Sequence, residues 1–170
     1  MPVYLITLHA YRSWRPDHPR GFVQRDKGIQ PPNPELARAY DENAKHPPMI
    51  FDAAIQQLLI WGGKEICDQR GWRLHGAATE PTHVHYLVSW EEPRLTWREV
   101  RKRIKNVLSW MLGKFKDRKG GHWFVEDGSR KRVKDRTHFD YLVNEYLPKH
   151  RGLRWFEGDP APQSPAGFEP

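Results

Sequence analysis

Runs of apolar residues at two different spacings divide the chain into expected strands and helices. Residues 3–11 (VYLITLHAY) form a short apolar run rich in β-branched and aromatic side chains, which is typical of a buried strand. Residues 72–78 and 83–90 have the same character and are separated by the turn-forming sequence TEPT. The pattern therefore predicts one buried strand and, later in the chain, an antiparallel hairpin.

Three other segments carry the spacing of amphipathic helices. Residues 50–70 place their apolar side chains on one helical face, and Gly71 is expected to end that helix. Thr96 and Glu99 form a capping box that opens a helix running to about Lys116. A third helix is expected over 134–147, because Pro148 cannot continue it. Each of these helices is predicted to pack its apolar face against the sheet.

The remaining segments contain proline, glycine and polar residues. Residues 12–48 hold seven prolines and are predicted to be a long, partly irregular insertion. Residues 122–133 (HWFVEDGSRKRV) contain an Asp-Gly turn between strand-like pieces, which predicts a small hairpin with SRKR near its tip or on its return strand. The proline-rich residues 157–170 are expected to be a disordered tail.

The order of these elements predicts an α+β fold, in which helices pack on one face of an antiparallel sheet. A length of 170 residues suits a single domain, expected over residues 1–156 with the insertion at about 12–48. Lys and Arg outnumber Asp and Glu by 28 to 21, and the resulting charge of +7 favours contact with a polyanion such as nucleic acid. The chain is therefore expected to be a globular protein with an anionic partner.

The short apolar runs, the N-terminal sequence and the single cysteine favour a cytoplasmic protein associated with the nucleoid. The apolar runs are much shorter than the roughly 20 residues of a spanning helix, and the N-terminus lacks the pattern of a secretion signal, so no membrane partner is expected. Cys67 is the single cysteine, which excludes an internal disulfide and a cysteine-based zinc cluster and suits a reducing compartment.

His83 and His85 are the first candidates for chemistry. Alternate side chains of a strand share a face, so the two imidazoles are expected to point the same way, about 6.5–7 Å apart at Cβ, and to converge on one ion. The opposite face is then apolar, formed by Val84, Tyr86, Val88 and Trp90. With nine histidines in the chain, however, a pair at this spacing is also compatible with chance.

The stretch TEPTHVHYLVSW resembles the histidine, bulky residue, histidine motif of the HUH endonucleases. It is most similar to the IS200-like, single-tyrosine transposases and their REP-associated relatives, and DYLVNEYLPKHRG (140–152) is similar to their tyrosine helix. The resemblance implies a ferredoxin-like fold, two histidines that bind Mg²⁺ or Mn²⁺, and a tyrosine that attacks DNA to give a 5′-phosphotyrosine and a free 3′-OH. It also implies that the partner is single-stranded or hairpin DNA and that the protein is a homodimer.

Two tyrosines compete for the role of nucleophile. In the family a metal-contacting amide or carboxylate follows the tyrosine by four residues, and Glu145 follows Tyr141 at that distance. Tyr146 is followed at the same distance by His150, but Pro148 lies between them and argues against a continuous helix. Tyr141 is therefore the preferred nucleophile and Glu145 the third metal ligand, with Tyr146 as the alternative.

DNA contacts are expected from basic residues on the 96–116 helix and in SRKR, although a charged turn or a solvated helix face explains them equally well. The candidates are Arg98, Arg101, Lys102, Lys105, Arg130, Lys131 and Arg132. Two other functions remain open: a DNA-binding protein of the same fold that no longer cleaves, and a metal-dependent hydrolase without a covalent step. Resealing through a phosphotyrosine needs no ATP, which agrees with the absence of a phosphate-loop motif.

Overall fold

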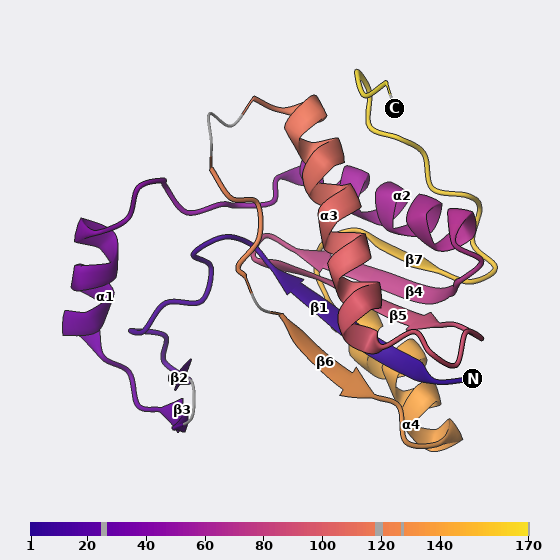
Figure 1. Cartoon of the computed structure of the whole chain (residues 1–170), viewed down its shortest axis with the longest axis horizontal. Helices are drawn as coiled ribbons and strands as arrows, with labels where there is room; N and C mark the ends of the chain where they lie inside the picture. Colours follow the sequence, from indigo (N-terminus) through magenta and orange to yellow (C-terminus); the bar gives the residue numbers. More distant parts are fainter. Residues whose placement is uncertain (25–26, 118–120, 127, 170) are drawn as a thin grey trace.

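A five-stranded antiparallel sheet forms the centre of the computed structural model (Figure 1). The structure describes residues 1–24, 27–117, 121–126 and 128–169. In the order in which they lie in the sheet, its strands are β6 (Ser129–Arg132), β1 (Val3–His9), β5 (His83–Ser89), β4 (Arg73–Glu80) and β7 (Arg154–Phe156). The expected hairpin is formed by β4 and β5, and the predicted first strand, β1, lies on the other side of β5. The predicted α+β class with an antiparallel sheet is confirmed.

Two long helices, α2 (Ala53–Gln69) and α3 (Trp97–Phe115), cover one face of the sheet (Figure 1). Asp52 caps α2 by accepting a hydrogen bond from the Ile55 N–H, and the expected capping box opens α3. Both helices pack on the apolar face of β5, where Tyr86 is fully buried and donates its hydroxyl to the Leu59 carbonyl at 2.8 Å. This face of the sheet is the main hydrophobic core.

The other face of the sheet is also covered, which the prediction of helices on one face did not foresee. Here the chain forms α4 (Arg136–Tyr141), a π-helical turn η1 (Leu142–Tyr146) and a 3₁₀ turn η2 (Leu147–Lys149). Leu142 and Leu147 pack on Leu5, Ala78 and Leu87 in a second, smaller core. Since the strands carry apolar side chains on both faces, an antiparallel sheet open to water on one side would leave these residues exposed.

Residues 12–48 contain a two-stranded sheet of β2 (Phe22–Gln24) and β3 (Gly28–Gln30), followed by helix α1 (Pro34–Glu42). This insertion extends to one side of the main sheet (Figure 1). Arg12 holds it by donating a hydrogen bond to the His46 carbonyl at 2.9 Å. The segment is therefore more regular than its prolines suggested.

The hairpin predicted over 122–133 is wrong. Phe124 bridges to Ala10, and β6 pairs with β1, so both pieces lie along the same edge of β1 and do not pair with each other. Asp127, the first residue of the expected turn, lies outside the described residues. Both segments pair along this edge because the backbone N–H and C=O groups of β1 on that side would otherwise lack hydrogen-bond partners.

The segment predicted as a disordered tail follows a defined path over residues 157–169. It leaves β7, a strand that the sequence pattern did not reveal, and the Trp155 indole donates a hydrogen bond to the Pro160 carbonyl at 3.0 Å. Phe168 is buried against the rings of Trp61 and Phe115. Burial of this one aromatic side chain offsets part of the entropy cost of ordering a proline-rich segment.

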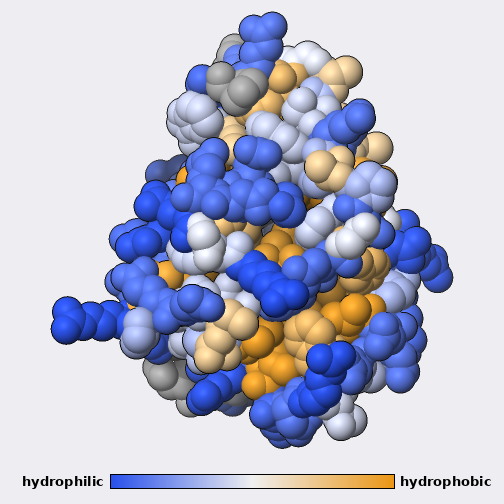
Figure 2. All heavy atoms as spheres, turned by 90° about the vertical axis from the view of Figure 1, so that its right-hand side faces the viewer, coloured by the Kyte–Doolittle hydropathy of each residue, from blue (hydrophilic) through white to orange (hydrophobic). Residues whose placement is uncertain are grey.

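The face of the molecule at the start of β1 carries mostly hydrophilic side chains around a strip of apolar ones (Figure 2). Val3 pairs there with Ser89, whereas His9 pairs with His83 at the other end of the same two strands. The histidine pair thus lies far from this face. No helix within the described ranges has the length and apolar character needed to cross a membrane.

Candidate metal centre and active site

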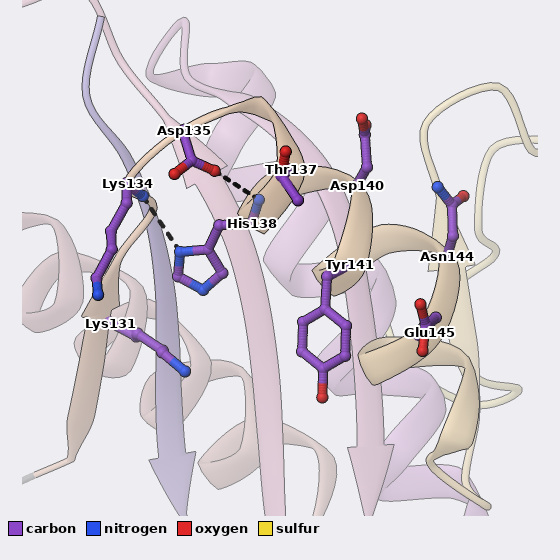
Figure 3. A pocket seen from close by; sticks show the side chains of 9 residues that line it. All are labelled: Lys131, Lys134, Asp135, Thr137, His138, Asp140, Tyr141, Asn144 and Glu145. Atoms are coloured by element: carbon purple, nitrogen blue, oxygen red, sulfur yellow. Dashed lines mark hydrogen bonds between the residues drawn. The ribbon is translucent and has the colours of Figure 1, made fainter.

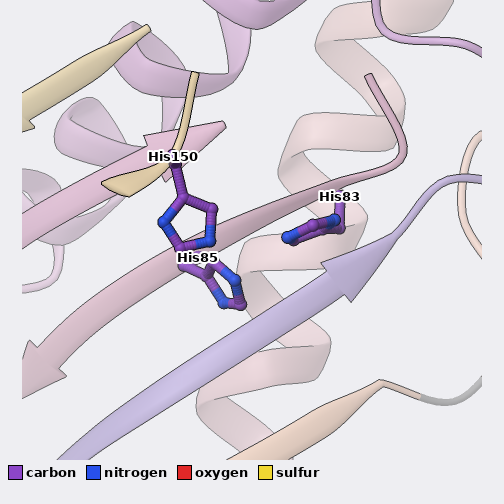
Figure 4. A group of neighbouring side chains, drawn as sticks. All are labelled: His83, His85 and His150. Atoms are coloured by element: carbon purple, nitrogen blue, oxygen red, sulfur yellow. The ribbon is translucent and has the colours of Figure 1, made fainter. Parts of the chain in front are cut away.

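Three histidines meet over the face of the sheet that carries α4. His83 and His85 point to the same side of β5, as strand alternation predicted, and His150 follows η2 (Figure 4). One ring nitrogen from each lies within 4.8 Å of the others. The apolar side chains of β5, among them Val84 and Tyr86, belong to the core on the opposite face. The structure therefore brings together three imidazoles where the sequence pointed to two.

Each imidazole is oriented by a hydrogen bond from behind. His85 Nδ1 lies 2.7 Å from the buried Thr7 hydroxyl, and His83 Nδ1 lies 3.0 Å from the Thr82 hydroxyl. His150 Nδ1 donates to the carbonyls of Tyr146 and Leu147, both at 3.1 Å. These bonds leave the Nε2 atoms free to turn toward the common centre, an arrangement typical of metal-binding histidines.

Burial keeps the two strand histidines neutral. Burial, with repulsion from the neighbouring imidazoles as a smaller cause, lowers the pKa of His83 to about 4 and that of His85 to about 2. His9, opposite His83 on β1, has a pKa lowered by burial as well. At neutral pH these rings therefore present lone pairs, which metal coordination requires.

The donor set fits a divalent metal ion. Three neutral imidazoles suit ions of borderline softness, whereas Mg²⁺ prefers oxygen ligands. The neighbouring carboxylate, Glu80, accepts a hydrogen bond from the Arg151 N–H at 2.6 Å. The ring nitrogens thus supply the candidate ligands, and open positions would remain for oxygen atoms of a substrate or water.

Tyr146 is the tyrosine beside the histidines. Its hydroxyl lies 3.4 Å from His85 Nε2, and its ring contacts those of His85 and His150, with centroids 5.4 and 5.1 Å away. Burial raises the pKa of this phenol, and Tyr141 raises it further. The hydroxyl therefore needs a positive charge beside it before it can lose its proton at neutral pH.

Tyr141 and Glu145 lie elsewhere within this chain. Tyr141 is 42% exposed and lines an open pocket with Glu145 on α4 and η1 (Figure 3), and no contact joins either side chain to the three histidines in the described part of the chain. The Glu145 carboxylate pairs with Lys149 at 3.9 Å. The structure thus puts Tyr146 and His150 in the positions that we expected for Tyr141 and Glu145.

A change of helix type explains why Tyr146 and His150 come together despite Pro148. In a regular α-helix the ring of Pro148 would clash with the carbonyl of Asn144. In the structure Leu147 donates its N–H to the Leu142 carbonyl, one residue further back than in an α-helix, and a 3₁₀ turn follows. The helical path therefore continues past the proline. The four-residue spacing of a regular α-helix did not predict this, because the π-turn changes the number of residues per turn.

The predicted DNA contacts divide between the two faces of the sheet. Arg98, Arg101 and Arg130 surround the ring of Trp97 at 4.6, 5.2 and 4.3 Å from its centroid, on the side of α3. Arg101 and Lys105 also donate to backbone carbonyls between Val125 and Gly128. Lys102 and Arg132 are exposed, and Lys131 lines the Tyr141 pocket on the face that carries the histidines.

Comparison with known proteins finds similarity in structure but none in sequence family. No family model matches the chain, and no curated protein matches its sequence. A crystal structure of a "putative transposase" from Deinococcus radiodurans R1 is similar over 90% of this chain and 92% of that one, with a TM-score of 0.41 and 14% sequence identity. The function of the site must therefore be argued from its own geometry.

Proposed function

We propose that the protein cleaves and rejoins single-stranded DNA, with Tyr146 as the nucleophile and a divalent metal held by His83, His85 and His150. The observation that carries this proposal is the position of the Tyr146 hydroxyl, 3.4 Å from His85 Nε2 and beside a cluster of three imidazoles. A hydrolase that used water would need the three histidines but no tyrosine beside them. The activity is the one that the resemblance to the IS200-like transposases implies.

The proposed reaction exchanges one phosphoester bond for another. The Tyr146 oxygen attacks the phosphorus, the bond to the 3′ oxygen breaks, and the phenolic proton is balanced by the proton that the leaving 3′ oxygen gains. The 5′-phosphotyrosine retains the phosphoester, so attack by a 3′-OH reverses the step without ATP. The role of the chain's own side chains is to direct imidazole lone pairs toward the phosphate site, from His83, His85 and His150. Thr7 keeps His85 in that orientation.

The metal, when bound, would stabilise charge on the phosphate oxygens and the phenolate. Of the two ions that the resemblance implies, Mn²⁺ suits a site of three imidazoles better than Mg²⁺ does. The proposed partner is single-stranded or hairpin DNA, and the homodimer implied by the resemblance belongs to the same proposal.

The test is to incubate the protein with labelled, hairpin-bearing single strands and Mn²⁺, and to look for a covalent adduct that a protease removes. We expect an adduct with the unaltered protein and with Tyr141→Phe, and none with Tyr146→Phe or His83→Ala. Tyr141→Phe is the matched control, because it removes a hydroxyl from the same helix only one turn away.

An adduct that persists in Tyr146→Phe would contradict the assignment of the nucleophile. Cleavage without any adduct would favour the hydrolase. Binding without cleavage would favour a DNA-binding protein of this fold that no longer cuts. Each result therefore separates the proposal from one named alternative.

A further inference from the structure

An open pocket of about 750 Å³ lies on the face of the sheet that α4 and η1 cover (Figure 3). Its wall is formed by the end of β6 and by α4 and η1, and the exposed ring of Tyr141 stands in it. The Tyr141 and Tyr146 rings lie 6.3 Å apart. A chain bound at Tyr146 would therefore have its neighbouring unit at this pocket.

The side of the pocket toward β6 carries two lysines and the carboxylate of Asp135, which caps α4 by accepting a hydrogen bond from the His138 N–H at 2.8 Å. Lys131 and Lys134 line it, and neither makes an ion pair within the part of the chain that the structure describes. His138 lies behind them: its Nδ1 accepts a hydrogen bond from the Lys134 N–H at 3.2 Å, so its proton lies on Nε2. That Nε2 is shielded from water and has no partner among the described residues. This side of the pocket is therefore suited to an anionic oxygen.

The opposite side presents acceptors. Asp140, Asn144 and Glu145 follow one another along α4 and η1, beyond the Tyr141 ring (Figure 3). Asp140 pairs with Arg136 at 2.8 Å and Glu145 with Lys149 at 3.9 Å, and the carboxylate oxygens of both can still accept further hydrogen bonds. The pocket thus has donors at one end, acceptors at the other and an aromatic face between them.

We infer that this pocket binds one unpaired nucleotide adjacent to the phosphate that Tyr146 attacks. The phosphate of that nucleotide contacts Lys131 and Lys134, and the base stacks on Tyr141. The acceptors on the far side favour a base with an exocyclic amino group over thymine. The inference rests on the proposed function for its position on the DNA, but the binding itself requires neither metal nor cleavage.

Binding is tested on Tyr146→Phe, which cannot form the adduct, without metal. The probes are single-stranded dC and dT decamers, and a dC decamer with a central 2-aminopurine, whose fluorescence falls on stacking. We expect the fluorescence to fall on binding, the dC decamer to bind more tightly than the dT decamer, and Glu145→Ala to reduce that preference. Adding Tyr141→Ala should weaken binding about tenfold or more and abolish the quenching, whereas Tyr141→Phe should retain both.

The lysines are tested through the salt dependence of binding. Replacing Lys131 and Lys134 by alanine should reduce the slope of log K against log salt by about 0.7, the value expected for the loss of one phosphate contact on a single strand. The matched controls are Tyr40→Ala, which removes another exposed tyrosine, on α1, and the pair Lys27→Ala and Lys45→Ala in the insertion. These controls should bind like the starting protein.

The inference fails if Tyr141→Ala binds as tightly as Tyr40→Ala, or if the two lysine pairs change the salt slope equally. These outcomes are independent of the adduct assay. An adduct without any effect of Tyr141→Ala on binding would leave the proposed function standing and remove the nucleotide pocket. Binding with the expected pattern but without an adduct would leave the nucleotide pocket standing and contradict the proposed function.

Discussion

Thr7 is the residue that decides which nitrogen of His85 faces the proposed metal. It is buried, and its hydroxyl lies 2.7 Å from His85 Nδ1. Thr7→Val keeps the shape of the side chain but leaves that nitrogen without a partner. We expect Mn²⁺ to bind about 10–100-fold more weakly, as measured by titration calorimetry. Thr7→Ser keeps a hydroxyl and should retain most of the affinity; equal binding by Thr7→Val and the unaltered protein would contradict this role.

The neutral histidines should make the stability of the metal-free protein depend on pH. His83 has its pKa lowered to about 4 and His85 to about 2, against 6.5 for a free histidine. Between those values the unfolded chain binds protons that the folded chain does not, so the free energy of unfolding should decrease as pH falls below about 6.5. Urea unfolding at pH 7 and pH 5 measures this change.

The matched variant for this pH dependence is His85→Gln, which cannot titrate. It should show a smaller loss of stability between pH 7 and pH 5 than the unaltered protein. An equal loss in both would show that other groups, such as the carboxylates, control the acid sensitivity.

At this scale the sequence indicated two of the four side chains that the structure brings together, His83 and His85 but not Tyr146 and His150. His83 and His85 follow from the two-residue period of a strand, which holds wherever the strand is correctly located. Tyr146 and His150 do not follow from the helical period, because Pro148 excludes the regular α-helix on which that period depends. The π-turn that accommodates the proline depends on packing against the sheet, and a local pattern does not contain that information.

Contact between α2 and β5 depends on a glycine. A Cβ at Gly63 would lie 2.3 Å from the buried ring of Tyr86, whereas a Cβ at Gly113, on the exposed side of α3, would meet nothing within 4 Å. We expect Gly63→Ala to lower the free energy of unfolding by roughly 1–3 kcal/mol through overpacking. Gly113→Ala should raise it by about 0.5–1 kcal/mol, because alanine favours a helix.

Thermal or urea unfolding of the two variants measures both effects. The pair is matched, since each adds one methyl group to a helix. A Gly63→Ala protein as stable as the unaltered one would show that α2 moves away from Tyr86 without cost.

Among the elements, the long helices were predictable and the short edge strands were not. The capping box at Thr96 and the apolar faces of 50–70 and 96–116 are local signals, and α2 and α3 appear where they indicated. β6 and β7 have four and three residues, and each exists only because a neighbouring strand offers unpaired backbone groups. The partner of such a strand is remote in sequence, so the pattern of residues 122–133 suggested a hairpin instead.

Over the whole molecule, Phe168 ties residues 157–169 to the helical layer. Its ring is buried between α2 and α3, against Trp61 and Phe115. We expect Phe168→Ala to speed hydrogen exchange in this segment and to lower the free energy of unfolding by roughly 1–3 kcal/mol. This is less than the 3–5 kcal/mol typical of a central core position, because the segment can detach locally.

Leu153→Ala is a suitable control for this variant, since it removes an apolar side chain that is 43% exposed. It should leave the exchange of residues 157–169 unchanged. If Phe168→Ala also leaves the exchange unchanged, the aromatic contact does not hold the segment.

The order of the strands has a consequence for synthesis on the ribosome. β1 leaves the ribosome first, yet both of its partners come much later: β5 about eighty residues on and β6 about forty residues after that. Until then its apolar side chains, including Ile6 and Leu8, have no sheet to join, and a chaperone would find them accessible. The histidines of the proposed metal centre lie at the same late junction, because His150 is the last of the three to be made. A nascent chain should therefore acquire its ion only after nearly the whole sheet has closed.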